Sequence, residues 1–226
     1  MWAPDGKSIV VGSKRGENTF GLYLHRLDGR SPVELVWANP LPFWPDPNSW
    51  TPDGRNIVFT TKGTSTHDDI WVVSLDDRRA RPWLQTAAGE YGGRVSPDGR
   101  WMAYTSNESG RDDVYVQPFP GPGAKQLVSE AGGLNPIWSR DGRELFYRRG
   151  SDVVVVGIEL TPSFTVGKPA VVFKGRYRLT GRDFDVSPDG TRFVMMRTDD
   201  ERTSNTLSLF LNWPKGLADR LQGAAR

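Results

Sequence analysis

The sequence contains no cysteine and only two histidines among its 226 residues. The absence of cysteine excludes disulfide bonds and thiolate metal sites, and it fits any redox compartment. The two histidines, His25 and His67, are too few for a zinc enzyme, which needs several His or Cys ligands. No apolar run approaches the roughly 20 residues of a membrane-spanning helix, since the longest candidate is Val153–Ile158. We therefore expect no metal, no other cofactor and no membrane insertion within this chain.

The charged residues are nearly balanced and show no clustering by sign. The chain has 29 Lys and Arg residues against 27 Asp and Glu residues, and the two kinds are interleaved along its length. A nucleic-acid-binding domain normally presents a clustered basic face. The charge pattern therefore argues against nucleic acid as a partner.

Motifs of nucleophilic and phosphoryl-transfer catalysis are missing as well. The Gly-x-Ser-x-Gly motif of serine hydrolases does not occur, and the segment Gly63–His67 fails at its last position. The segment His25–Asp28 echoes the catalytic loop of kinases, but the glycine-rich loop and the metal-binding Asp that a kinase needs are absent. These observations predict that the chain is not an enzyme.

What the sequence has is a repeated phrase, set in a chain with 25 Gly, 17 Pro and nine Trp. The phrase occurs at Trp2–Lys7, Trp50–Arg55, Val95–Arg100, Trp138–Arg143 and Val186–Thr191. Its aspartates, spaced 48, 45, 43 and 48 residues apart, are Asp5, Asp53, Asp98, Asp141 and Asp189. A period in the forties is typical of a four-stranded propeller blade.

Each repeat has the chemistry of a tight turn followed by short strands. In Pro-Asp-Gly, proline presets φ, Asp bonds the nearby backbone and Gly accepts a positive φ. The strands expected directly after the turns are Ser8–Gly12, Asn56–Thr60, Trp101–Thr105, Glu144–Tyr147 and Arg192–Met196. Third strands are expected at Val33–Val36, Arg81–Leu84, Lys125–Val128 and Ala170–Phe173. The pattern predicts an all-β propeller of four-stranded antiparallel blades with five recognisable repeats.

These residues carry a resemblance to a known family. Five in-phase copies of [Trp/Val]-[Ser/Thr/Ala]-Pro-Asp-Gly-[Lys/Arg] resemble the TolB-type, WD-like β-propeller repeat over about residues 1–213, with departures at Arg140 and Thr191. Such repeats occur in TolB, in propellers attached to bacterial serine/threonine kinases and beside peptidase domains, so the resemblance implies a fold more than a function. The ending Thr206–Trp213, followed by Pro214, resembles the terminal strand of the kinase-associated subgroup.

The repeats also suggest how the chain is organised. We expect a propeller over residues 1–214, with repeats starting near residues 2, 45, 91, 134 and 182, and a tail over residues 215–226. The first repeat has almost no leading strand, and the last repeat stops after its second complete strand. Because a propeller must close its ring, we expect these repeats to be part of a larger ring, with Met1 as an internal start or the start of a truncated gene model. A five-bladed ring closed by rearrangement is the alternative.

The repeated residues have a structural interpretation. The five aspartates sit in turns, where Asp is favoured for local hydrogen bonding rather than for catalysis. Trp2, Trp50 and Trp138 occupy one fixed position in the repeat, and we expect them to pack between neighbouring sheets.

In a propeller the innermost strand leads into the Pro-Asp-Gly turn, so we expect the longer connections to lie on the opposite face. They are Lys14–Phe20, Ala38–Ser49, Lys62–Asp68, Gln85–Gly93, Asn107–Asp112, Ser129–Asn135, Lys174–Arg182 and Thr198–Asn205. Binding residues concentrate on loops held by rigid scaffolds. Aromatic, Arg and Asn side chains there predict a peptide-binding rim. The candidates are Trp44, His67, Tyr91, Arg111, Asn135, Tyr177 and Arg182. We therefore expect a non-enzymatic module that binds a protein or peptide. The resemblance implies a periplasmic or other extracytoplasmic location. Two alternatives stay open, namely the sensor region of a larger bacterial serine/threonine kinase and the gating propeller of a peptidase.

Overall fold

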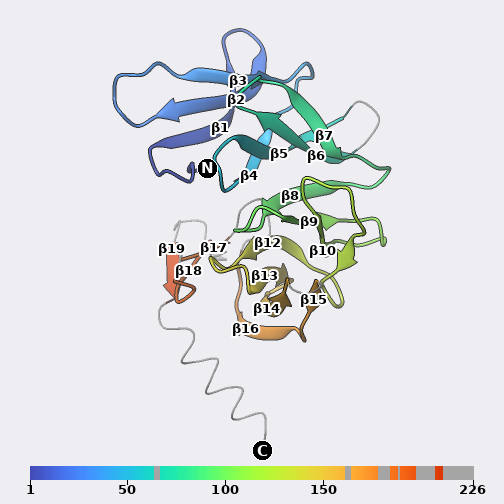
Figure 1. The fold of residues 1–226 in the computed structure, drawn as a ribbon. Helices are drawn as coiled ribbons and strands as arrows, with labels where there is room; N and C mark the ends of the chain where they lie inside the picture. Colours follow the sequence, from blue (N-terminus) through green and yellow to red (C-terminus); the bar gives the residue numbers. More distant parts are fainter. Residues whose placement is uncertain (64–66, 161–163, 178–183, 188, 197–206, 211–226) are drawn as a thin grey trace, which may run out of the picture. The chain divides into compact units, whose positions relative to one another are not determined.

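The computed structural model describes residues 1–63, 67–160, 164–177, 184–187, 189–196 and 207–210. Within these ranges the chain forms β-strands and turns and no helix, and therefore no helix that could cross a membrane. The residues fall into two compact units, Met1–Val128 and Ser129–Arg226, which are described separately below (Figure 1). Arg182, the tail over residues 215–226 and the whole connection over residues 198–205 lie outside the described residues.

The first unit contains three antiparallel sheets. The first sheet has the order β1-β2-β3, with β1 Ser8–Arg15, β2 Thr19–Arg26 and β3 Glu34–Ala38. The second has the order β4-β5-β6-β7, with β4 Asp46–Trp50, β5 Asn56–Lys62, β6 Asp68–Ser74 and β7 Ala80–Leu84. The third has the order β11-β10-β9-β8, with β8 Glu90–Val95, β9 Trp101–Ser106, β10 Asp113–Pro118 and β11 Gln126–Leu127.

The second unit contains two further antiparallel sheets. One has the order β12-β13-β14-β15, with β12 Leu134–Trp138, β13 Glu144–Arg149, β14 Asp152–Glu159 and β15 Thr165–Val166, and β16 Ala170–Lys174 also pairs with β14. The other has the order β17-β18-β19, with β17 Phe184–Val186, β18 Phe193–Met196 and β19 Leu207–Phe210. The second and third sheets have four antiparallel strands with the turn phrase between the first two, as the repeat predicted. The first and fifth sheets have three strands within the described residues, and the phrase of the first sheet precedes β1. The fourth sheet has a fifth strand.

The sheets are stacked, and the alternation of side chains along β5 shows how. Ile57 and Phe59 pack in one cluster with Val10 and Leu22 of the first sheet. Val58, between them in the chain, packs in a second cluster with the third sheet. Successive side chains of a strand point to opposite faces of the sheet. The second sheet is therefore covered on both faces, which explains why β5 is buried from Ile57 to Thr61.

The second unit is held together by a cluster of its own. Phe146 and Val153 of the fourth sheet are buried together with Phe184 and Phe193 of the fifth. The rings of Phe146 and Phe193 meet edge to face, with centroids 5.3 Å apart. Aromatic pairs in this geometry contribute about 0.5–1.5 kcal/mol beyond their buried area. Adjacent blades are thus joined by side chains from their facing surfaces.

The turn phrase forms one recurring set of hydrogen bonds. In the third sheet, the Ser96 hydroxyl donates to Asp98 over 2.6 Å and accepts from the Trp101 backbone N–H over 3.0 Å. The Asp98 carboxylate also accepts from the Arg100 backbone N–H over 3.1 Å. The same three bonds recur at the turns that begin with Thr51, Ser139 and Ser187. The phrase [Ser/Thr]-x-Asp-Gly therefore supplies its own cap between two strands.

One expectation about the repeat was wrong. Trp2 was expected to pack between sheets, but it is 63% exposed. Trp2 forms an isolated bridge with Ile9 of β1. Within the first unit, the first sheet packs against the second sheet on one face only. Trp138 is 9% exposed, and Trp50 packs partly buried against the cluster of the first two sheets. The position in the repeat is therefore buried only where a neighbouring sheet covers it.

Candidate functional site

We use the term loop end for the end of the first unit opposite its Pro-Asp-Gly turns. Its connections contain fewer residues than the sequence predicted, because the strands extend further. Residues 14–20 were expected to be a loop, but Lys14 pairs with Phe20 and Arg15 with Thr19 at the end of the β1–β2 ladder. The stretch Asp46–Ser49, expected to end the next loop, is part of β4. The ladders extend because their backbone groups continue to pair, whatever the polarity of the side chains. The connection between β3 and β4 is thereby reduced to residues 39–45.

This connection presents exposed aromatic side chains beside lysines. Trp44 is 62% exposed, and its ring meets Phe20 edge to face with centroids 5.5 Å apart. Phe43 is 38% exposed. The Lys14 ammonium lies 5.4 Å from the centre of the Phe20 ring, and Lys62 lies 5.8 Å from that of Phe43. We call these five residues (Lys14, Phe20, Phe43, Trp44 and Lys62) the aromatic rim.

Asn39 holds the rim loop in place. Its side-chain amide donates to the Phe43 carbonyl oxygen and to the Thr61 hydroxyl, each over 2.9 Å. Its carbonyl oxygen accepts from the Leu41 backbone N–H over 3.0 Å. Because these bonds tie the loop to the end of β5, the two exposed rings are presented by a fixed backbone. A preformed loop loses less conformational entropy when it binds a partner.

Three other predicted residues gather at the ends of β6, β8 and β10. Tyr91 is half-buried in β8, and burial together with the Asp112 carboxylate raises the pKa of its hydroxyl. Exposed Arg111 pairs with the buried carboxylate of Asp113 over 3.1 Å. His67 is exposed beside the backbone of Gly89. His67, Tyr91 and Arg111 therefore lie at or next to the ends of β6, β8 and β10, whereas Trp44 belongs to the connection between β3 and β4.

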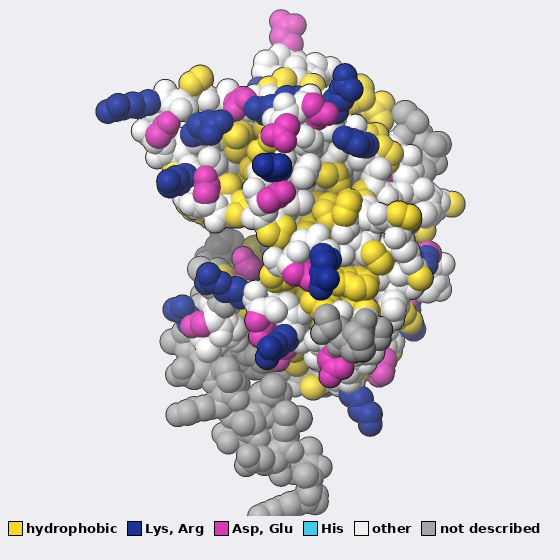
Figure 2. Space-filling view, viewed as in Figure 1, with side chains coloured by type: hydrophobic (Ala, Val, Ile, Leu, Met, Phe, Trp, Pro, Cys, Tyr) yellow, Lys and Arg dark blue, Asp and Glu magenta, His cyan; other side chains and the backbone are white. Residues whose placement is uncertain are grey.

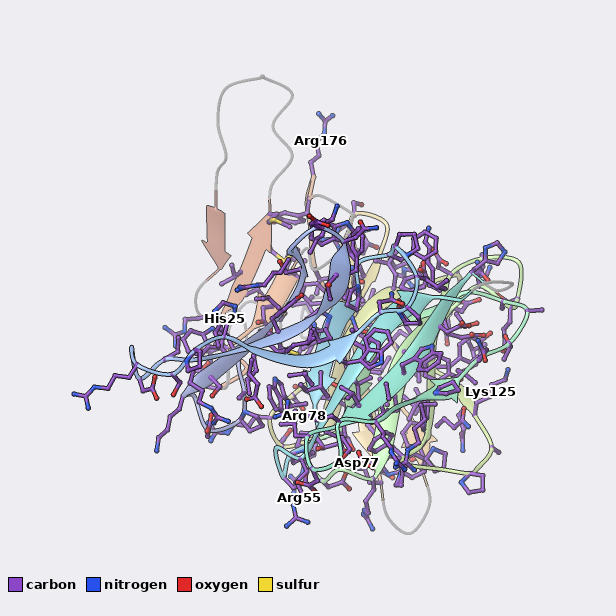
Figure 3. The ribbon with its side chains drawn as sticks, turned by 90° about the horizontal axis from the view of Figure 1, so that it is seen from above. His25, Arg55, Asp77, Arg78, Lys125 and Arg176 are labelled. Carbon is purple, nitrogen blue, oxygen red and sulfur yellow. The ribbon has the colours of Figure 1, made fainter. Side chains whose placement is uncertain are left out.

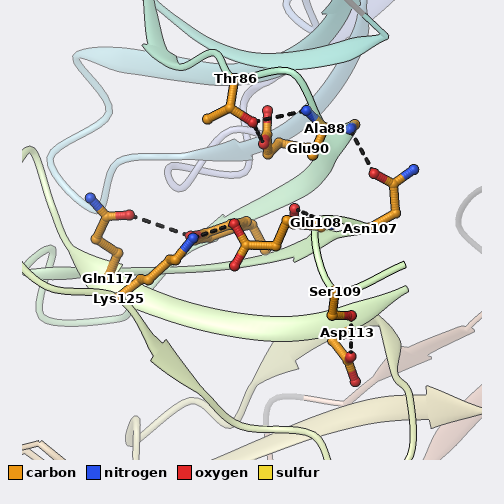
Figure 4. A network of polar contacts seen from close by, with 12 residues as sticks. Thr86, Ala88, Glu90, Asn107, Glu108, Ser109, Asp113, Gln117 and Lys125 are labelled. Carbon is orange, nitrogen blue, oxygen red and sulfur yellow. Dashed lines mark hydrogen bonds and ion pairs between the residues drawn. The ribbon is translucent and has the colours of Figure 1, made fainter. Parts of the chain in front are cut away.

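Beneath these residues lies a buried polar network that sequence reasoning missed (Figure 4). Glu90 is 1% exposed and accepts a hydrogen bond from the Thr86 hydroxyl. Its second oxygen, Oε2, accepts no hydrogen bond from the described residues. Burial raises the pKa of Glu90, and the nearby carboxylate of Asp69 raises it further. Asp69 is fully buried and accepts from the Gln85 side chain over 2.9 Å.

The network also reaches the neighbouring hairpin of the third sheet. The Ser109 hydroxyl donates to Asp113 over 2.7 Å, and Lys125 is paired with Glu108. The Gly89 backbone N–H donates to Asn107 over 2.9 Å. These bonds tie the connections of the second and third sheets to one another. The signal in the sequence was an aspartate near the start of two strands. Asp113 is the first residue of β10, and Asp69 is the second residue of β6. Only the packed sheets show that both aspartates are buried.

In the second unit, two of the predicted binding residues, Asn135 and Tyr177, have features that belong to the fold itself. Asn135 lies at an irregularity in β12 and has a φ of 55°. Such a positive φ is a left-handed conformation that Asn tolerates better than most residues. Tyr177 meets Phe173 edge to face with centroids 5.9 Å apart, and the buried Arg148 lies 5.4 Å from the centre of its ring. Tyr177 is thus packed against the interior of this unit. The seventh candidate, Arg182, lies outside the described residues.

The described surface carries charges of both signs. On the face drawn in Figure 2, the described Lys and Arg side chains alternate with Asp and Glu side chains and with apolar patches. Among the described residues, no group of three or more His, Asp or Glu side chains could hold a metal ion. The exposed rings of the aromatic rim can bury apolar surface of a partner, and Lys14 and Lys62 can pair with its carboxylates.

Comparison with known proteins gives the following matches, while no protein-family model matches the chain. The chain is 32% identical to the Tol-Pal system protein TolB of Anaeromyxobacter dehalogenans over 130 residues, which are 57% of this chain and 29% of that relative. The crystal structure of TolB from Acinetobacter baumannii superposes with a TM-score of 0.71 at 21% identity, over 93% of this chain and 50% of that one. An oligogalacturonate lyase in complex with manganese superposes with a TM-score of 0.64 at 14% identity, over 96% of this chain and 62% of that one.

These matches confirm the predicted fold and the predicted similarity to TolB. The superpositions identify the stacked antiparallel sheets as blades of a β-propeller. The chain spans less than a third of the length of the TolB relative and half of the TolB chain of known structure. At these low identities the structural likeness to a lyase concerns the fold alone, because one fold hosts many activities.

Proposed function

We propose that this chain is a non-enzymatic propeller module of the TolB type that binds a protein or peptide at its loop end. The observation that carries the proposal is the aromatic rim, in which Trp44 is 62% exposed on a loop fixed by Asn39. Tryptophan is enriched among the residues that dominate binding energies at protein interfaces. A large exposed ring on a rigid backbone is suited to such a contact.

The similarity to TolB supports the same class of function. That relative is named for the Tol-Pal system, so a protein partner in a bacterial envelope and an extracytoplasmic location are parts of the proposal. The remaining predicted residues at this end, His67, Tyr91 and Arg111, extend the surface over the polar network. The two alternatives, a kinase sensor region and a gating propeller of a peptidase, are not favoured by the TolB matches.

The experiment is a selection of peptides followed by a comparison of two tryptophan variants. Peptides selected from a random phage-displayed library against the whole chain are synthesised, and their affinities are measured by calorimetry. Trp44→Ala is expected to weaken binding by about tenfold or more, because truncating an interface anchor costs roughly 2 kcal/mol.

Trp2→Ala is the matched control. Trp2 is 63% exposed, as Trp44 is, but it precedes the first Pro-Asp-Gly turn and lies away from the loop end. Its truncation is expected to leave the affinity within about twofold. Equal losses in both variants, or selected peptides whose binding ignores Trp44, would remove the rim as the binding site.

A further inference from the structure

A pocket lies between the first two Pro-Asp-Gly turns of the first unit, at the end opposite the aromatic rim. Its volume is about 480 Å³, within the range of about 300–1,000 Å³ that is typical of ligand sites. The first and second sheets both contribute to its apolar lining, which consists of Ala3, Pro4, Leu24, Trp50, Pro52 and Leu75. We call it the turn-end pocket, and the proposed function at the loop end does not use it.

The floor of the pocket is the end of the core between the first two sheets. Leu24 is buried in the cluster that joins these sheets, and Trp50 and Leu75 pack partly buried against that cluster. The Trp50 side chain therefore contacts the core and also lines the pocket. An indole ring attracts a cation that lies over its face, and it offers apolar contact area to the stem of a long side chain.

Backbone hydrogen bonds hold the walls of the pocket in place. In the first turn, the Ala3 N–H donates to the Ser8 carbonyl oxygen over 2.9 Å. The Leu75 N–H donates to the Arg55 carbonyl oxygen over 2.8 Å, which ties the segment after β6 to the second turn. Because the walls are preformed, fewer groups have to be ordered when a ligand binds.

The two carboxylates that line the pocket, Asp5 and Asp53, form no ion pair within the described residues. Asp53 accepts hydrogen bonds from the Thr51 hydroxyl and from a backbone N–H, and these bonds lower its pKa, so it is ionised at neutral pH. From the described residues, Asp5 accepts a single hydrogen bond, from the Lys7 backbone N–H. Ala3 supplies no hydroxyl where the other four turns have Ser or Thr. Of the five turn aspartates, Asp5 thus keeps the most capacity to bond a ligand.

Among the described residues, one cation lines the pocket, and it already has an acidic partner. Arg26 forms an ion pair with Glu34 over 3.4 Å. Lys7 and Arg55 follow the two aspartates in the chain and are exposed, but neither lines the pocket. Figure 3 shows the Arg55 side chain pointing outward. Even with Arg26 counted in full, two carboxylates face one guanidinium, so the charge of the lining is complementary to a cation.

We propose that the turn-end pocket binds an arginine side chain of a protein or peptide partner, whose guanidinium pairs with the Asp5 carboxylate and whose stem lies against Trp50. Arginine fits this lining better than lysine, because its planar guanidinium bonds carboxylates in a bidentate manner and stacks on aromatic rings. Apolar residues beside the arginine contact the prolines of the two turns. The site is independent of the aromatic rim, because it lies at the other end of the same strands.

The test uses three capped pentapeptides and the whole chain labelled with ¹⁵N. The arginine probe is acetyl-Gly-Leu-Arg-Leu-Gly-amide, and the matched probes carry lysine, or citrulline, which has nearly the same shape without the charge. Binding is followed by NMR titration in about 0.1 M salt, where distant charges are screened. The arginine probe is expected to bind at least about threefold more tightly than the citrulline probe, the scale of an exposed ion pair. The lysine probe is expected to lie between them, because an ammonium group does not stack on the ring.

Two variants that each remove one negative charge locate the site. Asp5→Asn is expected to weaken the arginine probe by at least about threefold, while asparagine can still accept the bond from the Lys7 backbone. Glu17→Gln removes an exposed carboxylate from the turn between β1 and β2, at the loop end, and is expected to leave the affinity within about 1.5-fold.

Three results would overturn the proposal. They are equal binding of the arginine and citrulline probes, equal effects of the two variants, and spectral shifts confined to residues outside the two turns, over residues 3–8 and 51–55. Trp44→Ala is expected to leave the binding of the arginine probe unchanged, so a failure at this pocket is distinguishable from a failure at the aromatic rim.

Discussion

The hydrogen-bonded turn offers an experiment in which a stabilising bond is removed from one repeat and added to another. Ser96 is fully buried, and its hydroxyl bonds both the Asp98 carboxylate and the Trp101 backbone N–H. Ser96→Ala removes the bond to a charged group and also removes the partner of the part-buried Trp101 backbone N–H. Bonds to charged groups contribute about 1.5–3 kcal/mol and neutral ones about 1 kcal/mol. We expect the free energy of unfolding to fall by about 2–3 kcal/mol.

The first repeat lacks this hydroxyl, because Ala3 stands where the others have Ser or Thr. Its backbone nevertheless bonds as in the third sheet: Ala3 N–H donates to the Ser8 carbonyl, and Gly6 N–H donates to the Ala3 carbonyl. Asp5 accepts from the Lys7 backbone N–H over 2.9 Å. Ala3→Ser is therefore expected to complete the turn and to raise the free energy of unfolding by about 1 kcal/mol in urea melts.

A control within the first turn identifies the cause of this gain. In the background of Asp5→Asn, the new serine loses its charged partner, and we expect its gain to fall to less than half. If Ala3→Ser gave no gain, or the same gain with and without Asp5, the account of the turn phrase as a side-chain cap would be refuted.

Three further predictions concern burial and packing. Glu90→Gln is expected to stabilise the chain by about 1 kcal/mol near neutral pH. Burial raises the pKa of Glu90 above its ordinary value of 4.5, so the native state binds the proton more tightly than the unfolded state does. The native state therefore loses stability as the pH rises above 4.5. In urea melts the advantage of Gln must therefore shrink towards acid, and a difference independent of pH would contradict this reasoning. Trp138→Ala is expected to cost about 3–5 kcal/mol and Trp2→Ala less than about 0.5 kcal/mol, so equal losses would show that burial does not set the cost. A methyl group on Gly12 would overlap the Pro45 carbonyl oxygen, whereas one on Gly157 would meet no atom within 4 Å. Gly12→Ala is therefore expected to cost about 1–3 kcal/mol and Gly157→Ala almost nothing, and the reverse order in thermal melts would refute the close approach at Gly12.

The strands that directly follow the turns were predicted best at their beginnings, except for β18, which begins at Phe193 and not at Arg192. The strands that start at Asn56, Trp101 and Glu144 begin at the predicted residue, because the preceding turn sets where pairing starts. β1 was predicted to end at Gly12 and continues to Arg15, because its ladder with β2 extends through polar residues. β15, with only two residues, has too few side chains to show an alternating pattern.

The candidate site was predictable only in part. Trp44 stands out as an aromatic residue in a connection between strands, and the structure leaves it exposed. Tyr177 has the same signal in the sequence, yet it packs against Phe173 and Arg148. The burial of Asp69 and Glu90 depends on which sheets are stacked. A single sequence does not contain that information in any local pattern.

The measurement that tests the proposed function most directly is hydrogen exchange of the whole chain with and without a selected peptide, read by mass spectrometry. The account predicts that protection from exchange rises over residues 39–45, in the loop that carries Trp44, and stays unchanged in the turn over residues 51–55. Protection confined to that turn, or no change at residues 39–45 at a saturating concentration of peptide, would contradict the proposal that the loop end of this propeller is its binding surface.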